Sequence, residues 1–124
     1  MEIMLFDREL EVMQVLWDKG SATVNEVRDA LPDEMARTTV LTVLRRIEEK
    51  GYVGHEDEGA RGHRYFPLIQ PEQVQESALD RLTRRLFDGS PGLLLTHLLA
   101  HKRLSATELR HLRRYVDEHF PKEE

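Results

Sequence analysis

Residues 37–51, RTTVLTVLRRIEEKG, combine three threonines and three arginines with a regular series of aliphatic residues. On a helical period the aliphatic residues fall on one face, which predicts a helix with one buried side. These residues are Val40, Val43, Leu44 and Ile47. The remaining faces carry the threonines and arginines, although β-branched threonine is a poor choice for an ordinary solvent-facing helix. Hydroxyl and guanidinium groups in this position suit hydrogen bonds to phosphates and to base edges in a DNA major groove.

Two shorter helices precede this segment. Apolar spacing predicts a first helix through residues 10–17, which stops at Gly20. The second helix has Thr23 as its N-cap and Glu26, three residues later, as the other half of a capping box. Pro32 closes this second helix. The three helices therefore fit into about fifty residues, each with a recognisable start or stop.

A hairpin is predicted directly after the third helix, which spans about 37–50. Two short strands, at about 52–57 and 63–67, flank a glycine-containing turn at 58–62. Three helices followed by a hairpin is the plan of a winged helix–turn–helix with a two-stranded wing. The fold class that follows is mainly α, of the α+β type.

The rest of the chain is predicted to be helical, at about 72–88, 92–101 and 105–120. Ser105 and Glu108 form a capping box at the start of the last helix. The predicted domains are a winged-helix DNA-binding domain, 1–68, and a helical dimerisation domain, 69–124.

Charge is distributed unevenly along this acidic chain, whose formal net charge is -5. Residues 1–34 hold nine acids and three bases, residues 35–65 five acids and six bases, and residues 66–124 nine of each. Any surface for nucleic acid is therefore a local patch in the middle segment. A general polyanion-binding protein is not expected.

Composition excludes several classes of function. The chain has no cysteine, which removes disulfides, thiol catalysis and cysteine metal sites. We find no acid–base pair, nucleophile constellation or phosphate-binding loop, so an enzyme is not expected and no cofactor is predicted. No stretch is apolar enough to span a membrane, and the acidic start does not resemble a secretion signal, so a cytoplasmic protein without membrane insertion is expected.

Two interpretations of the third helix compete. In the plainer one, the threonines are caps and the arginines are solvated. The position of the helix, just before a hairpin with further cations, argues against it. Acids at residues 56–58 lie beside those cations, so the wing is mixed in charge. A winged-helix adaptor for another protein should instead show apolar or acidic residues on this helix. We therefore predict DNA contacts from Arg37, Thr38, Thr39, Leu41, Thr42, Arg45, Arg46, Arg61, His63 and Arg64.

Apolar stripes in the C-terminal helices, starting at Val74, predict self-association. A helical segment this small has difficulty burying its own core, and a two-fold dimer also suits a protein that reads two half-sites. The alternative is a self-contained helical subdomain. The predicted dimer contacts are Leu82, Leu86, Leu94, Leu98, Leu109, Leu112 and Val116.

Four of the six histidines lie in this C-terminal region. His97 and His101 share a helix face at a spacing compatible with a metal ion, and Glu108 and His111 are the nearest candidates for a third ligand. Surface or interface histidines are the favoured interpretation, so no metal site is predicted. A metal-responsive repressor stays an alternative.

The chain resembles the penicillinase-repressor family of bacterial winged-helix repressors over about residues 5–118. The motifs that carry the resemblance are ELEVMQVLWDKG, TVNEVRDAL, RTTVLTVLRRIEEKGYV and RYFPL, followed by LFDGSPGLLLTHLLAHKRLSATELRHLRRYVDE. The resemblance implies a homodimer that binds a palindromic operator. It also implies that Thr39, Thr42 and Arg46 match the family's DNA-contacting positions.

Two features depart from the family's pattern. Thr38 and Leu41 stand where some members have a lysine and an arginine, which implies a different operator sequence. The family also implies relief of repression by a sensor-linked protease that cuts between an asparagine and a phenylalanine, in response to β-lactam antibiotics in the best-known members. The matching positions here, the candidate cleavage site, are His97 and Leu98.

Overall fold

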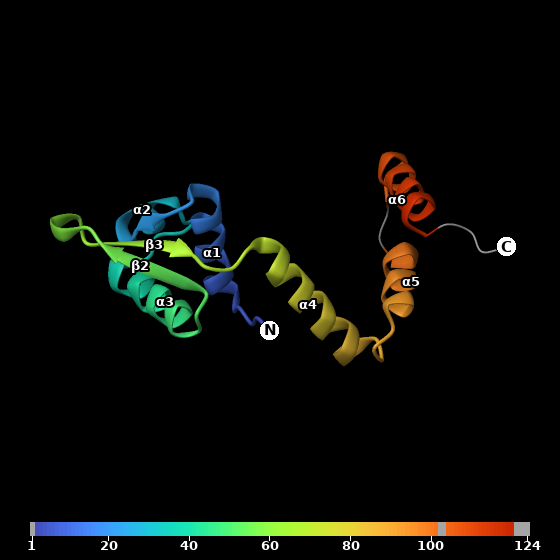
Figure 1. The fold of residues 1–124 in the computed structure, drawn as a ribbon, viewed down its shortest axis with the longest axis horizontal. Coiled ribbons are helices and arrows are strands. Elements are labelled where there is room, and N and C mark those ends of the chain that lie inside the picture. The colour runs from blue at the N-terminus through green and yellow to red at the C-terminus, as the bar shows by residue number, and fades with distance from the viewer. Residues whose placement is uncertain (1, 102–103, 121–124) are drawn as a thin grey trace. The chain divides into compact units, whose positions relative to one another are not determined.

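The computed structural model describes residues 2–101 and 104–120 (Figure 1). It contains two compact units, Met1–Asp80 and Arg81–Glu124. Helix α4, Pro71–Leu86, belongs to both, so the first unit continues past residue 68 into α4. Val74 of α4 packs against the core of the first unit. The sequence-based assignment of Val74 to the C-terminal stripes was therefore wrong, because an apolar pattern does not say which core a helix contacts.

The three N-terminal helices form where they were predicted. They are α1, Asp7–Lys19, α2, Val24–Ala30, and α3, Arg37–Glu49. Helix α1 ends at Gly20, whose φ of 82° is in the left-handed region that favours glycine. The capping box of α2 is also confirmed, since the Thr23 hydroxyl accepts a hydrogen bond from the Glu26 amide at 3.2 Å.

The sheet has three strands, one more than the predicted wing. Strands β2, Val53–Asp57, and β3, His63–Pro67, form an antiparallel hairpin whose tip carries a 3-10 turn, Gly59–Arg61. Strand β1, Ala22–Thr23, pairs with the other edge of β3, which gives the order β1-β3-β2. Figure 1 shows the hairpin tip extending past helices α2 and α3. The wing is thus joined directly to the segment that opens α2.

One hydrophobic core lies between these three helices and the sheet. It includes the predicted inner face of α3, with Val40, Leu44 and Ile47 fully buried and Val43 nearly so. Helix α1 contributes Met13 and Leu16 to the same core, and further members come from α2 and the strands. Burial of this face fixes the rotation of α3 about its own axis.

The N-terminal segment before α1 fastens α4 to the first unit. The Ile3 amide donates to the Ser77 hydroxyl at 2.8 Å, and that hydroxyl lies 3.2 Å from the Ile3 carbonyl. The Met4 amide donates to the Tyr52 hydroxyl at 3.0 Å. Ile3 itself is buried, so this attachment joins apolar packing with hydrogen bonds.

The C-terminal end of α3 is held by an ion pair between a half-buried lysine and a buried carboxylate. Lys50, which follows α3, places its ammonium 2.8 Å from a carboxylate oxygen of Glu9, and this carboxylate also accepts from the Phe6 amide at 2.8 Å. Glu9 is fully buried, and its second oxygen has no partner within the described residues. A buried carboxylate depends on such a cation, because an unpaired buried charge is strongly unfavourable.

The second unit contains the end of α4 and helices α5, Pro91–His101, and α6, Ala106–His119. The predicted capping box at Ser105 and Glu108 is confirmed. Most large apolar side chains of this unit are exposed: Leu82, Leu86, Leu93, Leu95, Leu98, Leu99, Leu109, Tyr115, Val116 and Phe120. Among the described residues, no helix has the length and apolar character to cross a membrane.

Leu44→Ala should reduce the free energy of unfolding by about 2–5 kcal/mol, since it removes a fully buried side chain and leaves a cavity. Thr39→Ala, on the exposed face of the same helix, is the matched control and should change the free energy by about 0.5 kcal/mol or less. Denaturant unfolding followed by circular dichroism measures both. Equal effects would contradict the assigned orientation of α3.

Candidate nucleic-acid interface

The exposed face of α3 carries the predicted hydroxyls and cations. Thr38, Thr39, Thr42, Arg45 and Arg46 are all exposed, on the side of the helix that does not enter the core. This surface, which we call the α3 outer face, has no acidic residue before Glu48. The structure thus brings together five of the ten predicted DNA-contacting residues on one helix surface.

The start of α3 is open, in contrast to the capped starts of α2 and α6. Its N-cap is Ala36, which makes no side-chain hydrogen bond, and the first turn holds no acid. The first amides of a helix lack intrahelical partners and lie at its positive end, so they attract anions such as phosphate. Arg37, at this end, donates from Nε to the Asn25 side-chain oxygen of α2 at 3.1 Å.

Thr42 offers a restricted set of contacts. Its hydroxyl donates to the Thr38 carbonyl at 2.9 Å, so the proton is used within the helix. The side chain is exposed, so its oxygen can still accept a hydrogen bond from an amino group of adenine or cytosine. Its methyl group can contact the methyl group of thymine. For Thr38 and Thr39 the described part of the chain shows no side-chain hydrogen bond, so their hydroxyls can both donate and accept.

Leu41 differs from the rest of the predicted set. It is only half-exposed and packs against the hydrophobic core from the flank of α3. Packing therefore explains a leucine here without any contact to DNA. Its role in base recognition stays a prediction.

The arginines of α3 differ in their partners. Arg37 is linked to α2, whereas Arg45 and Arg46 make no ion pair within the described residues. Their guanidinium groups stay available for phosphates and guanine edges, the two partners that suit a planar fork of donors. The free cations of α3 are therefore in its second half.

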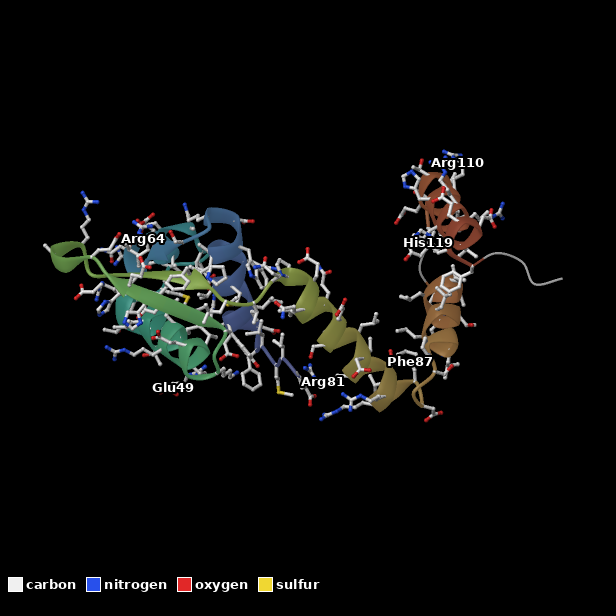
Figure 2. The ribbon with its side chains drawn as sticks, viewed as in Figure 1. Glu49, Arg64, Arg81, Phe87, Arg110 and His119 are labelled. Carbon is white, nitrogen blue, oxygen red and sulfur yellow. The ribbon has the colours of Figure 1, made fainter. Side chains whose placement is uncertain are left out.

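The wing has one engaged and one open arginine. Arg61, in the 3-10 turn at the tip, is exposed and has no ion pair in the described parts of the chain. Arg64, in β3, is labelled in Figure 2. It is half-buried, and its guanidinium nitrogens lie 3.0 Å from a Glu58 oxygen and 3.2 Å from a Glu26 oxygen. These carboxylates, with Glu58 first, raise the pKa of Arg64 above its ordinary value. The sequence predicted both arginines as DNA contacts, but not that Arg64 is bound within the protein.

A histidine cluster links the wing to α3. His63, predicted as a DNA contact, is exposed, and its ring lies 4.5 Å from that of His55 on β2. His55 Nδ1 lies 2.5 Å from a carboxylate oxygen of Glu48, near the end of α3, and its ring also packs on buried Tyr65. Burial, followed by the charge of Glu48, raises the pKa of Tyr65. Sequence reasoning missed His55 and Glu48, whose only signal was their position on facing elements.

The predicted dimer contacts are mostly on the surface of the second unit. Leu82, Leu86, Leu98, Leu109 and Val116 are exposed, while Leu112 is half-buried and Leu94 is buried. Leu94 is therefore largely covered already within the single chain. All seven dimer contacts stay predictions.

The histidines of α5 contact aromatic rings. The His97 ring lies 5.3 Å from that of Phe87 and 5.4 Å from that of His101. Within residues 2–101 and 104–120, no three histidine, aspartate or glutamate side chains are arranged to hold a metal ion. His97 and Leu98, the candidate cleavage site, are both exposed and lie inside helix α5.

Comparison with known proteins places the chain in a family. The family model described as "Penicillinase repressor" matches residues 5–118, which is most of the chain. The chain belongs to the penicillinase repressor family. It is 31% identical over 115 residues to a penicillinase repressor of Bacillus licheniformis, covering 91% of this chain and 89% of that one. It is 36% identical over 118 residues to the transcriptional regulator BlaI of Mycobacterium tuberculosis, covering 92% and 83%.

Membership of the penicillinase repressor family makes the chain a transcriptional repressor with a winged-helix DNA-binding fold and not an enzyme. Solved structures support the fold. A MarR family protein from Bacillus stearothermophilus has a TM-score of 0.52 at 19% identity, covering 94% of this chain and 73% of that one. MarR from E. coli, in its reduced form, has a TM-score of 0.50 at 18% identity, covering 94% and 79%.

The ionised Glu26 side chain should stabilise this repressor only above acidic pH. Hydrogen bonds from the Thr23 amide and hydroxyl, and then the charge of Arg64, lower the pKa of Glu26 below its ordinary value of 4.5. A lowered pKa in the folded state gives stability that is present above the unfolded-state pKa and lost as the pH falls through the folded-state value. Glu26→Gln should therefore be less stable than the wild type at neutral pH.

The difference between Glu26→Gln and the wild type should shrink when urea unfolding is repeated at a pH of about 3, where carboxylates are largely protonated. Glu49→Gln makes the same substitution at the exposed end of α3 and should not lower stability (Figure 2). A difference for Glu26→Gln that stays constant with pH would show that its ionised form contributes nothing.

Proposed function

We propose that the chain is a dimeric repressor whose α3 helices enter successive major grooves of a palindromic operator. The observation that carries this proposal is the α3 outer face, which is exposed, free of acids and lined with threonine and arginine, opposite a fully buried apolar face. Thr38, Thr39, Thr42, Arg45 and Arg46 are assigned to the groove, and Arg37 and Arg61 to phosphates. Leu41, His63 and Arg64 flank this surface.

The charge distribution favours selective binding over general attraction to DNA. The whole chain is acidic, with a formal net charge of -5, so its overall field repels a phosphate backbone. Within residues 35–65, Arg45 and Arg46 on the α3 outer face and Arg61 at the wing tip are exposed and have no acidic partner among the described residues. Random DNA should consequently be held weakly, and specificity should rest on base edges.

The exposed apolar surface of the second unit supports the dimer. Ten large apolar side chains are exposed in this unit, and exposed apolar surface of this extent usually marks an interaction site. A two-fold interface would cover Leu86, which is 72% exposed, and Leu98, which is 45% exposed. The two α3 helices would then read half-sites about one helical turn apart.

Relief of repression by a sensor-linked protease is the corresponding proposal for regulation. His97 and Leu98 occupy the family's cleavage position and are exposed, but their peptide bond lies inside α5. A protease needs an extended strand, so cutting here requires α5 to unfold locally. This repressor would act in the cytoplasm, where the bacterial chromosome lies.

Thr42→Ala and Arg46→Ala should each weaken binding to an operator selected from random-sequence DNA by about 1–3 kcal/mol, if both residues read base edges. Arg113→Ala, an exposed arginine of α6, removes the same charge outside the α3 outer face and serves as the control. Fluorescence anisotropy at several salt concentrations measures the dissociation constants. An equal loss on unrelated DNA would mark a phosphate contact, and binding insensitive to salt would contradict the proposal.

The wild type should sediment as a dimer at micromolar concentration. Leu86→Glu should shift the equilibrium toward the monomer, because it places a charge in the proposed interface. Leu68→Glu, at a side chain that is 56% exposed in the first unit, should leave the dimer intact. Sedimentation velocity measures the association state of each protein. A stable wild-type monomer would contradict the proposal that the second unit forms the dimer.

A further inference from the structure

Arg64 directs its guanidinium group into the protein. Its Nε donates to a Glu58 carboxylate oxygen at 3.0 Å, at the base of the wing turn, and a terminal nitrogen donates to Glu26 at 3.2 Å. The other terminal nitrogen lies 3.3 Å from the Ser21 hydroxyl. The side chain is only 30% exposed. Residues from three separate segments of the chain therefore hold one guanidinium group.

The carboxylate of Glu26 that receives Arg64 is itself fixed at the start of α2. The same oxygen accepts a hydrogen bond from the Thr23 amide at 3.3 Å, and the Thr23 hydroxyl accepts one from the Glu26 amide. Thr23 is also the register partner of Arg64 in the β1–β3 ladder. Backbone pairing and a shared carboxylate therefore attach β3 to the start of α2 at the same point.

The start of α3 is attached to this same end of α2. Asn25, next to Glu26, accepts the Nε hydrogen of Arg37 at 3.1 Å. The wing and the first residue of the DNA-reading helix are thus both tied to the first turn of α2. A change in the wing attachment would alter how the wing and α3 meet one DNA surface.

We propose that Arg64 is a positioning residue, which sets the wing against α2 and makes no phosphate contact. The proposal rests on the DNA binding proposed above. Turning the guanidinium outward would leave Glu26 and Glu58 without their cation beside a phosphate backbone, where two uncompensated acids repel DNA. Arg61, which has no ion pair in the described residues, supplies the phosphate contact of the wing.

Removal of the carboxylate of Glu58 changes operator affinity in opposite directions for the two alternative roles of Arg64, a positioning residue and a phosphate contact. Glu58→Gln should weaken operator binding about threefold to tenfold, since it frees the wing from Arg64. If Arg64 instead contacts phosphate, the same change releases the arginine and removes a negative charge, so binding tightens. Glu56→Gln makes the same charge change in β2, two residues before Glu58. Glu56 is the register partner of Arg64 but has no ion pair in the described residues, so this change should tighten binding slightly.

The salt dependence of binding provides the second measurement. Arg61→Ala should lower the slope of log affinity against log salt by about 0.9, the value for one lost phosphate contact, while Arg64→Ala should lower affinity with the slope unchanged. The probe is a duplex selected from random-sequence DNA by the wild type, and thermal melting verifies that each variant is folded. A slope that falls for Arg64→Ala, or tighter binding by Glu58→Gln, overturns the proposal. Absence of salt-dependent binding by the wild type would instead refute the proposed function.

Discussion

Burial of one side of α3 is the constraint on which the rest of the structure depends. Val40, Leu44 and Ile47 can leave water only if the helix turns this face toward α1, α2 and the sheet. The same rotation places Thr42 and Arg45 on the exposed side of the helix. The geometry of the candidate interface is therefore a by-product of core packing, and any substitution that loosens the core also disturbs the surface.

The first turn of α2 has a second organising role. It carries a capping box, pairs through Thr23 with the wing, and accepts hydrogen bonds from Arg64 and Arg37. A helix of seven residues gains little stability from its own hydrogen bonds, so its position depends on these attachments. These same attachments hold the side chains of Arg64 and Arg37, and the β2–β3 hairpin, in fixed positions relative to α2. The start of α2 thus orders parts of the interface that the hydrophobic core does not reach.

The sequence predicted what local patterns encode. The three N-terminal helices, the glycine stop at Gly20, the capping boxes and the hairpin all depend on residues within a few positions of one another. Strand β1 was not predicted, because two residues give no periodic pattern. The contacts of Arg64 and His55 were not predicted either, because they join segments that are separate in the sequence. Val74 was assigned to the wrong core for a related reason, since amphipathicity indicates that a face is buried but not by what.

The attachment of the N-terminal segment to α4 has a spectroscopic consequence. Amide hydrogens outside helices and strands normally exchange quickly with solvent, because no backbone hydrogen bond protects them. Here the Ile3 and Met4 amides donate to the Ser77 and Tyr52 hydroxyls, and Ile3 is buried. The exchange rate of the Ile3 amide therefore reports whether the N-terminal segment remains attached to α4, and that of the Met4 amide whether it remains attached to Tyr52. These two backbone signals follow both attachments with no label placed near the candidate interface.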